Sequence, residues 1–237
     1  MKGPRLRNYG IAVAVALGFA LLYYFGRPVW GPIKARLLGE RTVRQVLQEL
    51  QPRMSERFSG VVELTDGGPM SILAFKEERR LELWKKKGRG WTFVQSYPFT
   101  GYSGALGPKL REGDRQIPEG EYRIEYLNPN SSYHLSMKVD YPNAFDREMG
   151  VKDGRDRLGF DIFIHGSSVT IGCIPIGDDG IEELFYLVGE NGIENVTVVI
   201  CPRDFRTGKA PPAIAEIEWE DELYMRLAER LQSYPSP

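Results

Sequence analysis

The sequence predicts a β-rich α+β domain, and three observations favour this fold class. Between residues 61 and 201, short runs alternate apolar and polar side chains with the period of two that is typical of strands. Only one segment there, residues 180–189, repeats its apolar side chains as a helix does. The chain has 237 residues, 42% of them hydrophobic, which is enough for one ordinary domain with appendages. We therefore expect a mostly antiparallel sheet with one helix after residue 173.

The first element is an apolar segment at residues 8–26, which follows Lys2, Arg5 and Arg7. It is near the lower length limit for a membrane span, and it ends in bulky side chains rather than in a small-residue cleavage site. We interpret residues 1–34 as an uncleaved signal anchor. This predicts a single-pass inner-membrane protein with its body in the periplasm. A cleaved signal peptide is the alternative and predicts a secreted body.

Residues 35–60 place apolar side chains along one helical face, which predicts an amphipathic helical linker. Pro52 predicts a break near residue 51. Such a stripe usually packs on its own domain, although it could also bind a membrane or a partner.

Strands are expected within residues 61–202, separated by turns that are rich in Gly, Pro and Asn. The expected strands are residues 71–75, 80–84, 91–97, 122–127, 133–139, 158–164 and 195–200. We expect a basic turn at residues 85–90, a candidate substrate loop at 102–118 and a polar loop at 140–157. Residues 203–237 read as a linker followed by a short helix at 218–231.

The candidate site lies in residues 160–185, FDIFIHGSSVTIGCIPIGDDGIEELF. His165 ends a predicted strand, Cys173 follows in a loop, and Asp179 with Glu182 predicts a capping box that opens a helix. An imidazole can take the thiol proton, and the N–H groups of Gly172 and Cys173 can bind an oxyanion. This pattern predicts a nucleophilic thiolate whose pKa lies below the roughly 8.5 of a free thiol. A buried structural thiol is the alternative.

Other classes of site are disfavoured by the sequence. The two cysteines and two histidines have the wrong order and spacing for a zinc finger, so we expect neither a metal nor a cofactor. A net charge of −1 gives no support for nucleic-acid binding. We expect Cys201 to be a buried hydrophobe, since a disulfide with Cys173 would block the site.

Four segments carry a resemblance to a known family. They are 107–114 (GPKLREGD) with 118–120 (PEG), 127–136 (LNPNSSYHLS), 140–143 (DYPN), and 164–166 (IHG) through 172–173 (GC). In this order they resemble the L,D-transpeptidase catalytic domain (the YkuD fold), and specifically its YafK-like branch. The resemblance implies a β-sandwich domain over 61–202 that works on peptidoglycan stem peptides.

The resemblance also implies residue roles. Cys173 would be the nucleophile, His165 the proton donor and acceptor, and the Gly166 carbonyl the group that orients the imidazole. Gly172 and Cys173 would form the oxyanion hole. Pro175 stands where the wider family has an arginine, so binding of the substrate carboxylate would fall to Lys109, Arg111 or Arg115.

The remaining candidates and reactions stay open at this point. Tyr133, His134 and Thr170 are further substrate-binding candidates, although a structural role suits His134 better. Family members of this branch are transpeptidases, L,D-carboxypeptidases or amidases that cleave at diaminopimelate, and the sequence does not choose among them. A wall-binding module without catalysis is the alternative from another class, but such a module would need neither His165 nor Cys173.

Overall fold

The structure, a computed structural model, describes residues 39–58, 60–214 and 217–235. Internal contacts divide the chain into two units, Met1–Thr42 and Val43–Pro237, and all elements described below belong to the second unit. Within the described residues, no helix has both the length and the apolar character to cross a membrane. The expected anchor at residues 1–34 lies outside the described residues and stays a prediction.

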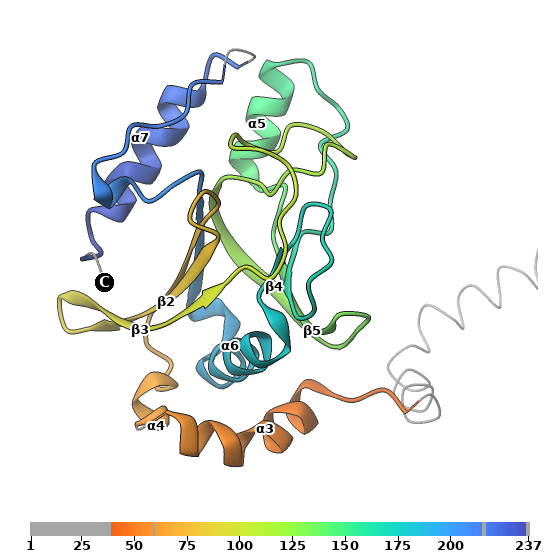
Figure 1. Cartoon of the computed structure of the whole chain (residues 1–237), viewed down its shortest axis with the longest axis vertical. Helices are drawn as coiled ribbons and strands as arrows, with labels where there is room; N and C mark the ends of the chain where they lie inside the picture. The colour runs from red at the N-terminus through yellow and green to blue at the C-terminus, as the bar shows by residue number, and fades with distance from the viewer. Residues whose placement is uncertain (1–38, 59, 215–216, 236–237) are drawn as a thin grey trace, which may run out of the picture. The chain divides into compact units, whose positions relative to one another are not determined.

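Eight strands form one mixed sheet in the order β3-β2-β1-β8-β4-β5-β6-β7 (Figure 1). Their bounds are Met70–Phe75 (β1), Arg80–Lys87 (β2), Gly90–Pro98 (β3), Gly120–Ser131 (β4), His134–Val139 (β5), Phe163–His165 (β6), Ile174–Pro175 (β7) and Val196–Cys201 (β8). The pairs β1–β8 and β6–β7 are parallel, and the other pairs are antiparallel. The β-rich α+β class is confirmed, and the sheet is mostly antiparallel as expected, with two parallel pairs that make it mixed.

The long strand β4 joins the two halves of this sheet. Its residues 120–123 pair with β8, and its residues 124–131 pair with β5 across irregular register shifts. Such shifts bend a strand and let it change partners. The two halves share β4 and form one eight-stranded order, so the β-sandwich implied by the resemblance is not built from two separate sheets.

The helices are α3 (Val43–Arg57), α4 (Val61–Leu64), α5 (Ala144–Lys152), α6 (Gly177–Asn191) and α7 (Glu220–Leu231), with 3-10 turns at Ile193–Asn195 and Phe205–Thr207. They include those expected at 35–60, 180–189 and 218–231, and two further ones, α4 and α5, within the β-rich part. The expected loop at 140–157 was wrong because it contains α5. Asn143 accepts the Asp146 N–H and the Asp146 side chain accepts the Asn143 N–H, which is a capping box that starts this helix.

The helix after Cys173 begins earlier than expected. α6 starts at Gly177 with no side-chain cap, so the capping box predicted from Asp179 and Glu182 was wrong. Glu182 binds His134 and Arg53 instead. Pro52 lies inside α3 without ending it, and its side chain is exposed.

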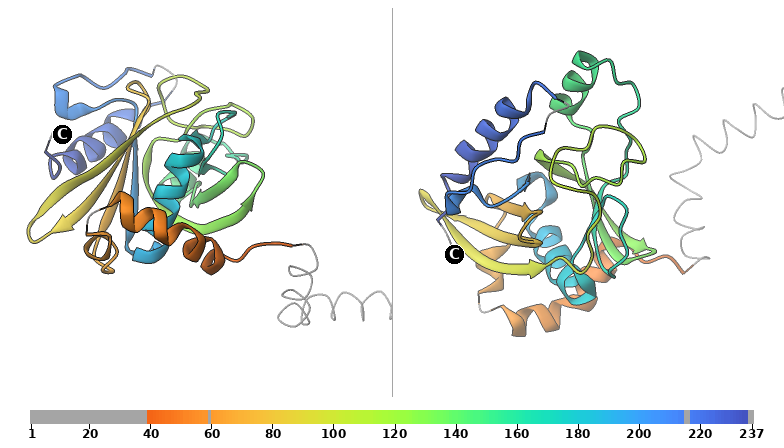
Figure 2. Two further views of the ribbon diagram at one scale, coloured as in Figure 1. Left: turned by 60° about the horizontal axis from the view of Figure 1, so that its bottom comes forward. Right: turned by 45° about the horizontal axis from the view of Figure 1, so that its top comes forward.

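One face of the sheet is covered by α6 and α3 (Figures 1 and 2). Alternate residues of β1, Ile72 and Ala74, pack there with Leu184 and Phe185 of α6. Val46 and Met54 of α3 are buried in the same core, so the stripe at 35–60 packs on its own domain. All six residues of β1 are buried because helices cover both faces of the sheet.

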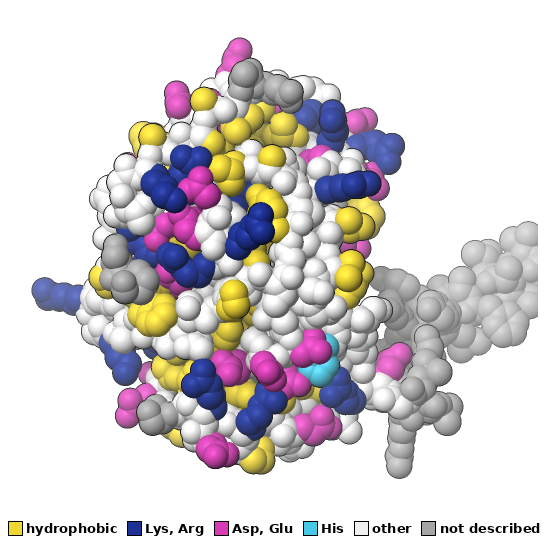
Figure 3. Space-filling view, in the orientation of Figure 1, with side chains coloured by type: hydrophobic (Ala, Val, Ile, Leu, Met, Phe, Trp, Pro, Cys, Tyr) yellow, Lys and Arg dark blue, Asp and Glu magenta, His cyan; other side chains and the backbone are white. Residues whose placement is uncertain are grey.

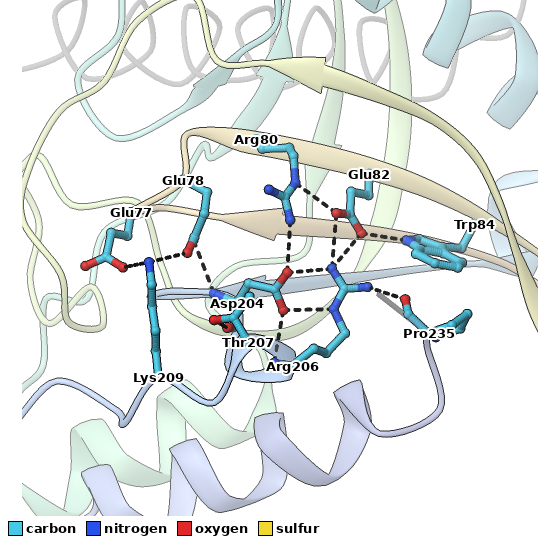
Figure 4. A network of polar contacts seen from close by, with 10 residues as sticks. All are labelled: Glu77, Glu78, Arg80, Glu82, Trp84, Asp204, Arg206, Thr207, Lys209 and Pro235. Carbon is cyan, nitrogen blue, oxygen red and sulfur yellow. Dashed lines mark hydrogen bonds and ion pairs between the residues drawn. The ribbon is translucent and has the colours of Figure 1, made fainter. Parts of the chain in front are cut away.

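The opposite face is covered by α7. Leu73 and Phe75 of β1 pack there with Leu223, Tyr224 and Leu227. A buried polar network ties β2 to the segment after β8, and its centre is Arg206, whose guanidinium pairs with Glu82 and Asp204 at 2.9 and 2.8 Å (Figure 4).

Two shorter expectations are also corrected. The strand expected at 158–164 is limited to β6, Phe163–His165. Lys85, expected in an exposed turn, is buried in β2, where its Nζ lies 2.7 Å from both Asn191 Oδ1 and Asp66 Oδ1.

Candidate active site

The site is built on the two shortest strands of the sheet. β6 ends at His165, β7 begins directly after Cys173, and the parallel register pairs Ile164 with Ile174. Cys173 therefore lies beside Phe163, whose N–H points at the cysteine Sγ at 3.4 Å. The register thus brings the segment that ends at His165 beside the segment that begins after Cys173.

The imidazole of His165 is buried and held in one tautomer. Its Nδ1 lies 2.6 Å from the carbonyl oxygen of Gly166. A carbonyl only accepts, so Nδ1 carries the proton in the neutral ring, and Nε2 keeps a free lone pair. The contact implied for Gly166 is present, and its catalytic role stays a prediction. The ring of Tyr133 packs on the imidazole with centroids 4.7 Å apart.

The sequence predicted an ionised thiol at Cys173, but the surroundings of this side chain favour the neutral form. Burial raises the pKa of Cys173, and the Asp161 carboxylate adds to this effect, while the Phe163 N–H and the Lys109 charge oppose it. Burial also lowers the pKa of His165. The Sγ atom lies 3.6 Å from the Asp161 carbonyl oxygen, and within the described residues no hydrogen bond joins it to the imidazole. The resting pair is therefore a neutral thiol and a neutral base.

Hydroxyl groups occupy the backbone donors at the nucleophile. Thr170 Oγ1 accepts the Cys173 N–H at 2.9 Å and donates to the Cys173 carbonyl oxygen at 2.7 Å. Ser103 Oγ accepts the Gly172 N–H at 2.8 Å. Both N–H groups that were expected to form the oxyanion hole thus already have acceptors. Thr170 braces the nucleophile loop, and no substrate role for it is visible in these contacts.

The acidic residues after the nucleophile do not orient the imidazole. Asp178 Oδ1 accepts the Ser167 N–H at 2.7 Å and so fastens the loop that follows His165. Asp179 is exposed beside Arg53.

Residues 102–118 form an irregular loop, as the sequence predicted, and this loop makes one wall of the site. Asp114 organises it by accepting the Lys109 ammonium at 2.5 Å and the N–H groups of Leu110, Arg111 and Gln116. Lys109 is only 7% exposed, and its positive charge acts on the Cys173 thiol. Gln116 backs onto the nucleophile loop, since its carbonyl lies 3.1 Å from where a Cβ on Gly172 would be.

The other basic candidates lie away from these contacts. Arg111 lines a cleft of about 680 Å³ with Lys152 and Arg155, bounded by α5 and residues 217–218. Arg115 has a positive φ of 60° within the loop. His134 pairs with Glu182 at 2.5 Å, so its contacts are structural.

Sequence reasoning missed Ser103. It lies 69 positions before Gly172, and the only signal was its place in the predicted substrate loop. In the described part of the chain, no group of three His, Cys, Asp or Glu residues could hold a metal ion. Figure 3 shows positive and negative side chains interspersed over one face of the molecule, in keeping with the net charge of −1.

Comparison with known proteins adds a family match. Residues 69–200 match the family model of the L,D-transpeptidase catalytic domain, YkuD. The chain is 41% identical over 124 residues to the Escherichia coli K12 protein named "Putative L,D-transpeptidase YafK". That alignment covers 52% of this chain and 48% of YafK, so the chain spans about half the length of this curated relative.

Solved structures give weaker similarity. The helical cell shape determining protein Pgp2 from Campylobacter jejuni is 21% identical with a TM-score of 0.49, over 66% of this chain and 57% of Pgp2. Bd1075 of Bdellovibrio bacteriovorus is 20% identical with a TM-score of 0.43, over 70% of this chain and 56% of Bd1075.

Proposed function

Because the chain belongs to the L,D-transpeptidase catalytic domain (YkuD) family, we propose that it is a cysteine acyl-transfer enzyme acting on peptidoglycan stem peptides. The observation that supports this proposal is the pairing of β6 with β7, which brings the free thiol of Cys173 and the imidazole of His165, fixed in one tautomer, to neighbouring chain segments. A binding module would need neither group.

The neutral resting pair defines how the thiol reacts. As the Cys173 sulfur adds to the substrate carbonyl carbon, its proton passes to His165 Nε2, and the carbonyl oxygen becomes negative. The tetrahedral species then collapses: the C–N bond breaks, and the leaving amine takes the proton from His165. A thioester remains on Cys173. An incoming amine or water resolves the thioester by the same steps in reverse, which gives transfer or hydrolysis respectively.

Lys109 is the best of the three candidates for the substrate carboxylate. Its ammonium has three N–H donors, and two are used by Asp114 and by the Arg111 carbonyl. We propose that the third donor binds the substrate carboxylate. Tyr133, which is 44% exposed over the imidazole, offers a ring edge and hydroxyl to the same substrate.

The test incubates the full-length chain with purified muropeptides and reads the products by mass spectrometry. Cys173→Ala removes the nucleophile, and Ser168→Ala serves as a matched control because Ser168 is exposed in the same loop. Cross-linked dimers indicate transfer, trimmed tripeptides indicate carboxypeptidase action, and release of a protein from diaminopimelate indicates an amidase. Equal products from the wild type and Cys173→Ala would refute the proposal.

We further propose that the catalytic domain lies outside the cytoplasmic membrane, because the uncharged run at 8–26 with basic residues before it is typical of a signal anchor. A reporter that is active only outside the cytoplasm, fused after residue 237, should be active. An inactive reporter with normal expression would contradict this location.

A further inference from the structure

The two hydroxyl groups at the nucleophile differ in one respect. Thr170 uses both its oxygen and its proton on the backbone of Cys173. Ser103 uses its oxygen to accept the Gly172 N–H, but its hydroxyl proton has no acceptor anywhere in residues 39–58, 60–214 and 217–235. Ser103 is partly exposed, so an arriving substrate can reach it. The site therefore contains one neutral hydrogen-bond donor without an acceptor among the described residues, the Ser103 hydroxyl, beside the residue that precedes Cys173.

Polarisation makes this donor stronger. A hydroxyl oxygen that accepts a hydrogen bond becomes a better donor through its own O–H. The Gly172 N–H, which was expected to bind the oxyanion directly, acts on the Ser103 oxygen instead.

Ser103 is also held in place before any substrate arrives. The Thr100 N–H donates to the Pro175 carbonyl at 2.9 Å, and the Thr100 hydroxyl donates to the Ser167 carbonyl at 2.6 Å. Gly101 lies so close to the nucleophile loop that a Cβ there would be 2.0 Å from the Ser168 carbonyl oxygen. Residues 100–103 thus cross the nucleophile loop from end to end. Donors fixed in advance stabilise developing charge without a reorganisation cost.

We propose that Ser103 is a catalytic residue whose hydroxyl donates to the carbonyl oxygen that becomes negative when Cys173 attacks. This inference rests on the proposed function only in taking Cys173 as an acyl-forming nucleophile. During attack the C–S bond forms, the carbonyl π electrons move to oxygen, and the Ser103 O–H bonds to that oxygen. The Gly172 N–H stays on Ser103 Oγ, and no proton is transferred from Ser103.

The test compares two reagents on the full-length chain. Acetylation by p-nitrophenyl acetate passes through a tetrahedral oxyanion, releases p-nitrophenolate and leaves a thioester on sulfur. Alkylation by iodoacetamide displaces iodide at a saturated carbon and forms no oxyanion. We expect Ser103→Ala to slow acetylation about 100-fold, the usual effect of removing one oxyanion donor, while alkylation changes less than about twofold. Ser103→Thr keeps the hydroxyl and should recover most of the acetylation rate.

Two controls make the result specific. Ser168→Ala removes a hydroxyl from the same loop and should alter neither rate. Cys173→Ala should abolish thioester formation and thiol alkylation, because the other cysteine, Cys201, is fully buried.

Each alternative outcome overturns the inference. Unchanged or faster acetylation in Ser103→Ala would show that the oxyanion is stabilised without the Ser103 hydroxyl, for example by the Gly172 N–H directly. Equal slowing of both reagents would show that Ser103 only positions the loop, and thioester formation that persists in Cys173→Ala would place the chemistry elsewhere. Since neither reagent is a wall peptide, a chain that ignores muropeptides but shows the selective effect would refute the proposed substrate and keep the role of Ser103.

Discussion

The buried ion pair of Lys76 and Glu119 gives the sharpest test of what fixes the loop at 102–118 to the sheet. Lys76 Nζ lies 2.9 Å from Glu119 Oε1, and both side chains have no exposed surface. Lys76 also donates to the carbonyls of Gly107 and Ile117 at 2.7 and 2.9 Å, so it bridges the two ends of the loop. Glu119 accepts the Gly107 N–H at 2.8 Å and the Tyr224 hydroxyl at 2.9 Å.

We expect Glu119→Leu to reduce the free energy of unfolding by about 3 to 5 kcal/mol, the usual cost of leaving one partner of a buried pair uncompensated. This is a large part of the roughly 5 to 15 kcal/mol that stabilises a domain. The double variant Lys76→Met with Glu119→Leu removes the stranded ammonium. It should recover about half of the loss, because the Tyr224 hydroxyl still lacks its acceptor.

Urea unfolding followed by circular dichroism measures these differences. The matched control is Glu125→Leu, an exposed glutamate on β4, which we expect to change stability by less than about 0.5 kcal/mol. A loss below about 1 kcal/mol for Glu119→Leu, or a double variant no more stable than the single one, would refute the reasoning.

Three further predictions concern the site and the sheet. Because burial raises the pKa of Cys173, its alkylation rate should rise with pH to a midpoint above the roughly 8.5 of a free thiol, and a midpoint at or below that value would contradict the structure. Because burial lowers the pKa of His165, its neutral base form should persist on acidification, so the acid limb of acyl transfer should have its midpoint below pH 6.5; a limb above that pH would argue against His165 as the base. Arg206→Met should reduce the free energy of unfolding in urea by about 2 kcal/mol, since Glu82 and Asp204 then keep, among the described residues, only the partly exposed Arg80 as their cation, and a neutral effect would count against the network.

Local patterns were sufficient for most strands and for the positions of His165 and Cys173, while the role of Cys173 as nucleophile stays a prediction. The alternation around Ile72 and Tyr122 predicted β1 and β4, and His165 ends β6 as predicted, with Cys173 in the loop before β7. The parallel partners β8 and β7 were not predictable, because pairing between distant segments leaves no mark within either segment.

The errors have a common physical cause. Glu182 matched a capping pattern, but tertiary contacts with His134 and Arg53 compete for its carboxylate. The Cys173 thiol was expected to ionise because of its sequence neighbours, whereas burial in the folded domain raises its pKa. Ser103 reaches Gly172 only after the chain has folded, so its spacing carries no motif.

The network around Arg206 decides where this protein can be shortened. A chain ended at residue 202, close to the last residue of the family match, would lose Asp204, Arg206 and all of α7. Of the cations that the structure describes, Glu82 would then keep only Arg80, and Leu73, Phe75 and Trp84 would face water. Such a fragment should collect as insoluble aggregate, so the tail is part of what makes the catalytic unit fold.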